Sequence, residues 1–172
     1  MPSDHTICST KAVFRLKEKI KTYVISIFIP LAVGGLSALL TRGSMDIYSD
    51  IVSPALAPPA ILFPIVWTVL YILMGVSSAI ICSSPALAIK KQSAMLTYGL
   101  SLFFNFFWSI FFFNFRWFLF SFIWLLGLLF LIVRTIMKYR RIKPIAAYLQ
   151  IPYALWVAFA GYLNLAIWLL NK

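Results

Sequence analysis

Residues 60–82 read AILFPIVWTVLYILMGVSSAIIC and contain no charged side chain. At about 1.5 Å of rise per residue, an α-helix of this length crosses the ~30 Å hydrocarbon core of a bilayer. Lipid offers no hydrogen-bond partners, so the backbone polar groups of such a segment must be satisfied within the segment, as they are in a helix. The run is therefore predicted to span a membrane.

Further apolar runs of similar length cover residues 23–40, 94–113, 117–137 and 144–170. The chain is 63% apolar and only 11% charged, with a mean hydropathy of +0.96, whereas soluble domains carry about 25% charged residues. The sequence thus predicts an all-α integral membrane protein, a bundle of five transmembrane helices. The predicted organisation is a basic N-terminal tail (residues 1–22) followed by one membrane domain (residues 23–171).

The first apolar run resembles a signal peptide because a basic stretch precedes it. It is longer than a typical signal-peptide core and lacks a clear cleavage site of small residues, so we expect it to be retained as a helix.

The basic residues are divided unequally between the two ends of the predicted bundle. Of the 15 lysines and arginines, only Arg42, Arg116 and Lys172 fall at one end, and the tail, the 83–93 loop and the 134–143 segment carry the rest. The positive-inside rule makes the richer end cytoplasmic, with the N-terminus inside and the C-terminus outside. We expect a multi-pass protein of the cell (cytoplasmic) membrane.

A net charge of +11 could indicate nucleic-acid binding in a soluble protein. Here the charges lie in short segments between apolar runs, without a basic face interleaved with aromatic residues, so no nucleic-acid partner is expected.

The connection between the first two runs, residues 41–59, is the only long one predicted on the outer side. It contains Asp46, Tyr48 and Asp50, followed by the proline-rich stretch SPALAPP at residues 53–59. Prolines restrict themselves and the residues before them to extended or turn conformations. We therefore expect a stiff lid, although Pro59 also suits the first turn of the next helix.

Acid–base and metal chemistry find little support in the sequence. The predicted helices contain no Asp, Glu or His, and Arg134 lies near enough to a helix end to reach the interface. Proton-coupled transport and general acid–base catalysis both need a titratable group close to the substrate. His5, Cys8 and Cys82 show no metal-ligand spacing. We expect no metal site, and a tetrapyrrole would have to bind through its ring.

Aromatic rings and amides instead gather on single faces of three predicted helices. The faces carry Trp67, Tyr71, Met74 and Gly75; Asn105, Trp108, Ser109 and Phe112; and Pro152, Trp156, Ala160 and Asn164. Taken singly, such residues are typical of helix packing and interfacial aromatic belts. Together they predict an aromatic pocket with a few polar anchors, suited to a flat hydrophobic ligand.

Small residues four positions apart, at Gly34/Ala38 and Gly75/Ala79, indicate close helix contact or dimerisation.

These residues belong to a longer pattern that runs over roughly residues 28–171. It comprises Pro54, Pro58-Pro59, Phe63, Val66-Trp67, Leu70-Tyr71, Met74-Gly75, Asn105, Trp108-Ser109, Phe112-Phe113, Ala147, Leu149, Pro152-Tyr153, Trp156, Phe159-Ala160, Leu163-Asn164 and Asn171. In this pattern the sequence resembles the TspO/MBR family (translocator protein, peripheral-type benzodiazepine receptor, tryptophan-rich sensory protein).

The resemblance implies a five-helix membrane protein whose pocket opens toward the 41–59 connection and is capped by it. Family members bind porphyrins such as protoporphyrin IX and haem, and animal members bind cholesterol and benzodiazepine-type drugs. We expect a porphyrin as ligand, no obligatory cofactor, and a homodimer in the lipid bilayer. By position, the ligand-binding residues would be Tyr48, Pro58, Phe63, Trp67, Asn105, Trp108, Ser109, Trp156 and Ala160.

The resemblance favours a sensory, regulatory or sequestering role in tetrapyrrole metabolism or stress. Two alternatives stay open. One is light-dependent porphyrin degradation, proposed for bacterial members, in which Trp156 and Trp67 would take part. The other is transport of hydrophobic ligands.

Several positions depart from the family pattern. Ser53 and Leu56 replace a frequent Lys and Trp, and Trp124 stands where an acidic residue is common. No Lys or Arg follows Tyr162 within five residues to complete a sterol-recognition pattern. A formal match at Val133, Tyr139 and Arg141 is of a weak kind, so sterol binding is not predicted.

Overall fold

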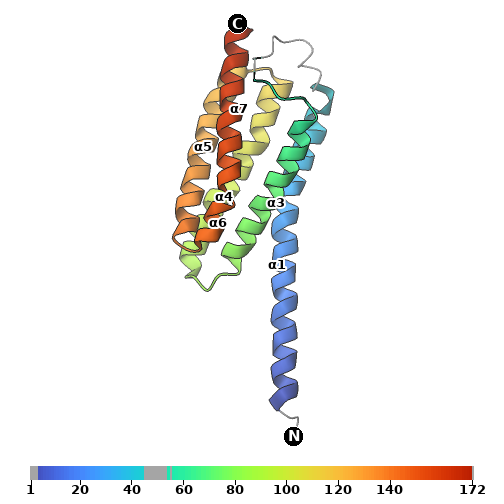
Figure 1. Cartoon of the computed structure of the whole chain (residues 1–172), viewed down its shortest axis with the longest axis vertical. Helices are drawn as coiled ribbons and strands as arrows, with labels where there is room; N and C mark the ends of the chain where they lie inside the picture. The colour runs from blue at the N-terminus through green and yellow to red at the C-terminus, as the bar shows by residue number, and fades with distance from the viewer. Residues whose placement is uncertain (1–3, 45–53, 55, 172) are drawn as a thin grey trace.

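The computed structural model describes residues 4–44, 54 and 56–171, with side chains from residue 16 onward. Every regular element in these residues is helical (Figure 1). The elements are α1 (Asp4–Thr41), the 3₁₀ turn η1 (Arg42–Ser44), α3 (Leu62–Cys82), α4 (Ala88–Ser109), the π-helical turn η2 (Ile110–Asn114), α5 (Phe118–Arg140), α6 (Pro144–Tyr148) and α7 (Ile151–Leu170).

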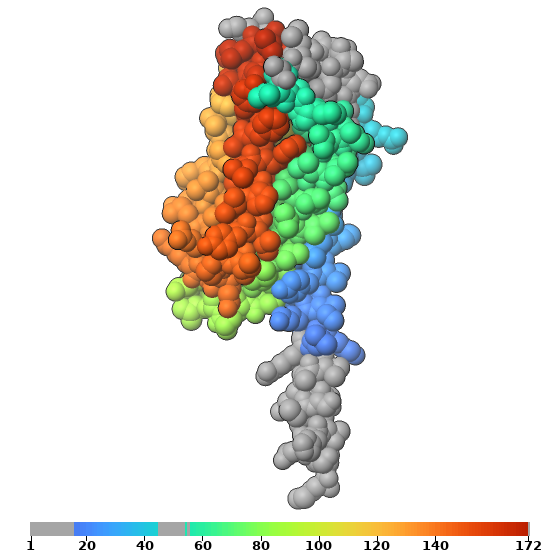
Figure 2. Space-filling model, in the orientation of Figure 1, coloured from blue at the N-terminus to red at the C-terminus, as the bar shows by residue number. Residues whose placement is uncertain are grey.

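The predicted all-α architecture is confirmed, because five helical stretches of the described chain are long and apolar enough to cross a bilayer. α1 packs along α3, α4 along α5, and α5 along α7, while the short α6 contacts α5 and α3. Figure 1 shows the chain ends at opposite ends of the molecule, and α1 runs well beyond the bundle on the N-terminal side. α3 and α7 lie side by side on the face shown in Figure 2.

α1 begins at Asp4, inside the segment expected to be a tail, so the basic residues extend the first helix. Residues 4–29 contain neither glycine nor proline, and their four lysines, one arginine and one glutamate are residue types that favour helix. The membrane helix therefore continues without interruption into the polar segment.

Two glycines let α1 and α3 approach closely. A Cβ atom at Gly75 would overlap the Cα of Ile27 and lie 2.8 Å from the carbonyl oxygen of Ser26. A Cβ atom at Gly34 would overlap the ring of Tyr71. Gly34 and Gly75, two of the small residues predicted for close helix contact or dimerisation, are thus used between two helices of the same chain.

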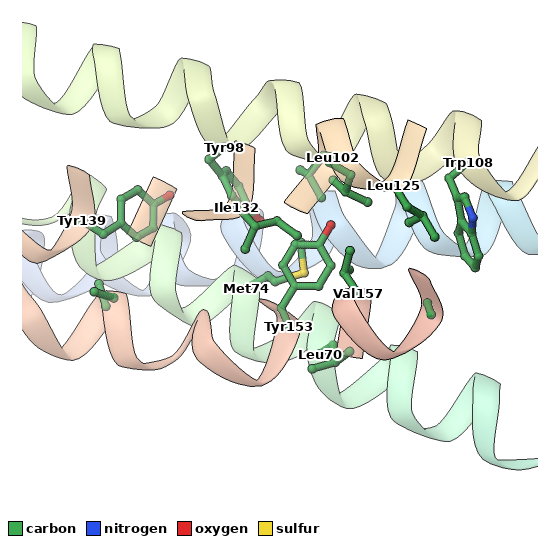
Figure 3. Close-up of a cluster of buried hydrophobic side chains, with 14 of the residues drawn as sticks. Leu70, Met74, Tyr98, Leu102, Trp108, Leu125, Ile132, Tyr139, Tyr153 and Val157 are labelled. Carbon is green, nitrogen blue, oxygen red and sulfur yellow. The ribbon is translucent and has the colours of Figure 1, made fainter. Parts of the chain in front are cut away.

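The core lies between α3, α4, α5 and α7, where side chains from all four helices meet (Figure 3). Its fully buried members include Met74, Leu128, Tyr139, Tyr153 and Val157. The buried hydroxyl of Ser77 bonds to backbone at this place, since its Oγ donates to the carbonyl of Ala146 at 2.7 Å. This bond fixes α6 against α3.

The fifth span, expected as one helix over residues 144–170, is divided into α6 and α7. Pro152 explains the break, because proline has no N–H for the carbonyl of Tyr148 and its ring crowds that carbonyl. The chain turns through Leu149 and Gln150, whose N–H groups donate to Ile145 at 3.2 Å and to Ala147 at 3.1 Å. On the two sides of this break, α6 and α7 both pack on α5.

Candidate ligand-binding site

A cavity of about 110 Å³ lies between α1, α3 and the end of α4. It is located where α1 ends at Thr41 and α3 begins at Leu62, the end of the bundle to which the 41–59 connection is attached. Its lining residues are Gly34, Ser37, Ala38, Thr41, Phe63, Pro64, Trp67, Tyr71, Trp108, Ser109 and Phe113.

Trp67 is the centre of the aromatic wall of this cavity. Its ring stacks on Tyr71 with a centroid distance of 5.4 Å and lies 6.0 Å from the ring of Trp108. Behind it, Tyr153 from α7 makes an edge-on contact at 6.2 Å. Contacts of this kind add about 0.5–1.5 kcal/mol per pair beyond apolar burial, so the wall is held in one arrangement before any ligand arrives.

Two asparagines fix the rings of this wall from behind. The Nδ2 of Asn105 donates to the hydroxyl of Tyr71 at 3.0 Å. The indole N–H of Trp108 donates to the Oδ1 of Asn164 at 3.5 Å, and the Nδ2 of Asn164 donates to the carbonyl of Ala160 at 2.9 Å. Neither asparagine lines the cavity. Both make the helix-packing hydrogen bonds that the simpler interpretation assigned to them, and the ligand-binding role of Asn105 stays a prediction.

One polar group of the cavity wall has unused hydrogen-bonding capacity. Ser37 is only 4% exposed, and its Oγ has no hydrogen-bond partner in the described structure. The backbone carbonyl of Ser37 accepts a bond from the hydroxyl of Thr41 at 3.0 Å. The side-chain hydroxyl of Ser37 is the group that stays free to donate. A buried polar group without a partner costs about 1–3 kcal/mol, so a ligand acceptor placed here would be favoured.

The end of α4 brings Phe113 to the cavity through the π-helical turn η2. In this turn the N–H of Phe115 donates to the carbonyl of Ile110 at 3.2 Å, one residue wider than in an α-helix. The Nδ2 of Asn114 then donates to the carbonyl of Leu40 at 3.1 Å, which ties the turn to the end of α1.

A second, larger hollow of about 580 Å³ lies between α3 and α7. Its walls are apolar and include the exposed side chains of Ile65, Val69 and Leu155, which puts it on the lipid-facing surface of the spans. Trp156 lines this groove and touches Phe63 edge-on at 5.9 Å. Since Phe63 lines the cavity, these two rings stand between the cavity and the groove.

Four of the nine residues predicted to bind ligand line the cavity: Phe63, Trp67, Trp108 and Ser109. The other five do not. Asn105 lies behind Tyr71, Ala160 is buried in the helix packing, Trp156 lines the groove, Pro58 is half-buried in the connection, and Tyr48 lies outside the described residues.

Sequence reasoning missed the wall formed by α1. Gly34, Ser37, Ala38 and Thr41 face the cavity at i, i+3, i+4 and i+7, the spacing of one helix face. The signal was present as a stripe of small and hydroxyl residues in an apolar run, of which only the Gly34/Ala38 spacing was interpreted.

Trp124 and the sterol-type pattern both lie away from the cavity. The indole N–H of Trp124 donates to the carbonyl of Phe104 at 2.7 Å, and the two rings stack at 4.2 Å, which joins α5 to α4. Tyr139, the tyrosine of the sterol-type pattern, is completely buried in the core (Figure 3). This tyrosine is therefore not presented to a ligand in the membrane.

Of the described residues that line the cavity, none has a carboxyl, imidazole, amine or thiol group, and most are aromatic or apolar. Among the described residues, no group of three or more His, Cys, Asp or Glu side chains is placed to hold a metal ion.

The sequence model of the TspO/MBR family matches residues 26–169, which include every residue of the cavity. The chain is 32% identical to Tryptophan-rich protein TspO of Chlorobaculum tepidum over 157 residues, 91% of this chain and 99% of that protein. It is 34% identical to Tryptophan-rich protein TspO of Archaeoglobus fulgidus over 150 residues, 86% and 95% of the two chains. Translocator protein of Bos taurus is 32% identical over 148 residues, 84% and 86%.

Proposed function

Since the chain belongs to the TspO/MBR family of membrane proteins, we propose that it binds a porphyrin-type ligand, such as protoporphyrin IX or haem, in the cavity between α1, α3 and α4. One observation carries the proposal: Trp67, Tyr71 and Trp108 form an aromatic wall in the cavity that Ser37, whose hydroxyl has no partner, also lines. A flat, conjugated ring with a few polar substituents matches such a wall. The role would be to sense or sequester the tetrapyrrole.

The residues that line the cavity suit a porphyrin, but the cavity itself is too small for one. A cavity of about 110 Å³ is smaller than a complete macrocycle of four pyrrole rings. The groove on the far side of Phe63 and Trp156 offers about 580 Å³ more. We infer that rotation of these two side chains joins the two spaces, so that the ring rests on Trp67 and extends toward α7.

The polar edge of the ligand would face the end of α1. Protoporphyrin IX and haem carry two carboxylates, which need hydrogen-bond donors or a counter-charge when they leave water. Ser37 supplies a hydroxyl inside the cavity, and Arg42 follows Thr41 as an exposed cation at the end of α1. This placement would keep the apolar part of the macrocycle against the aromatic wall.

The proposal is tested by titrating detergent-purified protein with protoporphyrin IX in the dark while recording the Soret band and tryptophan fluorescence. We expect a saturable Soret shift with parallel quenching, because Trp67 and Trp108 would contact the ring. A shift that never saturates, or fluorescence that changes no more than for free tryptophan, would contradict binding in the cavity.

The same titration under illumination addresses the enzyme alternative. Loss of the porphyrin bands with a new product, dependent on oxygen and abolished in Trp156→Phe, would favour light-driven degradation over simple binding. Equal spectra in light and dark would exclude that alternative. The expected homodimer and the transport alternative stay predictions.

A further inference from the structure

A third hollow, of about 390 Å³, lies at the other end of the bundle, between the start of α4 and the end of α5. Ile89, Lys90 and Ser93 from α4 and Lys138 from α5 line it, together with Arg141 and Ile142 just after α5. Three of its six lining residues are cations, whereas none of the described residues that line the aromatic cavity is charged.

Lys138 is held in a fixed position by groups of α4. Its Nζ donates to the carbonyl of Ser93 at 3.0 Å, to the Oγ of Ser93 at 3.0 Å and to the Oγ1 of Thr97 at 2.6 Å. The Oγ of Ser93 thus accepts a charge-assisted bond, and its own proton stays available for an acceptor in the hollow. A half-buried ammonium and a hydroxyl are in this way placed side by side.

No carboxylate neutralises these charges within the described structure. The only acidic residue whose side chain is described, Glu18, lies on α1, whereas the hollow belongs to α4 and α5. The positive end of the α4 helix dipole also lies at this end of the bundle, since α4 begins at Ala88. The hollow therefore has an uncompensated positive charge of three.

The surroundings of the hollow are apolar on the membrane side. Ile89 is 74% exposed, and the exposed Leu96 and Leu100 follow Ser93 on the same face of α4. On α5, the exposed Met137 precedes Arg141 by one helical turn. The cations of the hollow thus lie beside rows of exposed apolar side chains on α4 and α5. They lie at the end of the bundle where the helices leave the hydrocarbon.

We propose that this hollow binds the phosphate of an anionic phospholipid, with the phosphate beside Lys90, Lys138 and Arg141 and the acyl chains along α4 and α5. A phosphate could also come from a soluble phosphorylated compound, but the exposed apolar residues beside the hollow favour the lipid. The end concerned is the one that the charge distribution predicts to be cytoplasmic, where basic segments attract anionic lipids. The proposal is independent of porphyrin binding.

The test compares two double variants that remove the same charge from the same end of the protein. Lys90→Gln with Arg141→Gln removes two cations that line the hollow, and Arg140→Gln with Lys143→Gln removes two exposed cations that do not. Binding of dioleoylphosphatidylglycerol to delipidated protein is measured by native mass spectrometry. We expect at least about a tenfold loss of affinity in the first pair and little change in the second.

Two further measurements use the same instrument. Ser93→Ala keeps all charges and should weaken phosphatidylglycerol binding by about threefold, because it removes one hydroxyl donor. Glycerol phosphate, which has the headgroup phosphate without acyl chains, should bind far more weakly than the lipid.

Equal losses in both double variants would overturn the proposal, since they would show attraction by surface charge in general. Binding of glycerol phosphate as tight as that of the lipid would also overturn it, in favour of a soluble ligand. Phosphatidylcholine, which has a phosphate but no net charge, should not compete.

Discussion

Gly75→Ala should lower the free energy of unfolding by about 3 kcal/mol, because overpacking of this kind typically costs about 1–3 kcal/mol and here meets backbone. The added methyl would overlap the Cα of Ile27 and crowd the carbonyl of Ser26. Backbone atoms cannot rotate away, so α1 would have to move off α3. Because α1 forms one wall of the cavity, ligand affinity should fall as well.

Gly35→Ala is the matched control for this prediction. Gly35 is exposed on α1, and a Cβ there would meet nothing within 4 Å. Alanine is favoured over glycine in a helix by roughly 1 kcal/mol, so this variant should melt at the wild-type temperature or slightly above it. Thermal unfolding in detergent, followed by tryptophan fluorescence, decides the matter. Equal melting of Gly75→Ala and wild type would show that α1 does not pack on α3 at this point.

Trp67→Leu should lower the affinity for protoporphyrin IX by about 30-fold. Stacking of an aromatic side chain on a flat heteroaromatic ring is worth about 1–3 kcal/mol, and about 2 kcal/mol corresponds to roughly 30-fold in the dissociation constant. Trp67→Phe keeps a smaller ring in the wall, so its affinity for protoporphyrin IX should lie between those of the wild type and Trp67→Leu. Dissociation constants come from Soret titrations in the dark, with the melting temperature of each variant recorded beside them.

Trp117→Leu is the control, because Trp117 is 55% exposed and packs against Phe111, Phe115 and Phe120 away from the cavity. It removes an indole from the same protein without touching the proposed site. Affinities that fall equally in both variants would contradict a specific role for Trp67.

The five spans could be predicted from hydropathy because lipid imposes the same requirement on every crossing segment. The structure confirms them, and it also confirms that Trp67, Tyr71, Met74 and Gly75 share an inward face. These features depend on local sequence alone. The break at Leu149–Gln150 had a visible cause in Pro152, but membrane helices often tolerate proline, as α1 does at Pro30.

The π-helical turn η2 had no comparable signal. Residues 110–115 are IFFFNF, without glycine or proline, and nothing in them distinguishes a π turn from an α turn. Contacts with other segments accompany it, such as the bond from Asn114 to the carbonyl of Leu40 and the bond from the N–H of Trp117 to the carbonyl of Phe111. The position of Phe113 in the cavity could therefore not be predicted from the sequence pattern.

Trp156 shows that residues spaced four apart on a helix need not all face the same site. Each step of four residues advances about 40° beyond a full helical turn, so Trp156, Ala160 and Asn164 form a spiral rather than a straight row. Ala160 and Asn164 are buried, and Trp156 reaches the groove between α3 and α7. In the proposed binding mode its ring borders the ligand only when the cavity opens toward that groove.

The most direct test of the proposed site is to fill the cavity from one position of its α1 wall and leave the aromatic wall unchanged. Ser37→Leu replaces the unpartnered hydroxyl with an apolar side chain that occupies the hollow, and Ala32→Leu adds the same side chain on an exposed position of α1. The measurement is the dissociation constant for protoporphyrin IX of the two variants and the wild type in the dark. We predict a loss of at least about tenfold, or roughly 1.4 kcal/mol, for Ser37→Leu with an undiminished melting temperature, and no loss for Ala32→Leu. Unchanged binding by Ser37→Leu would show that the ligand does not occupy this cavity.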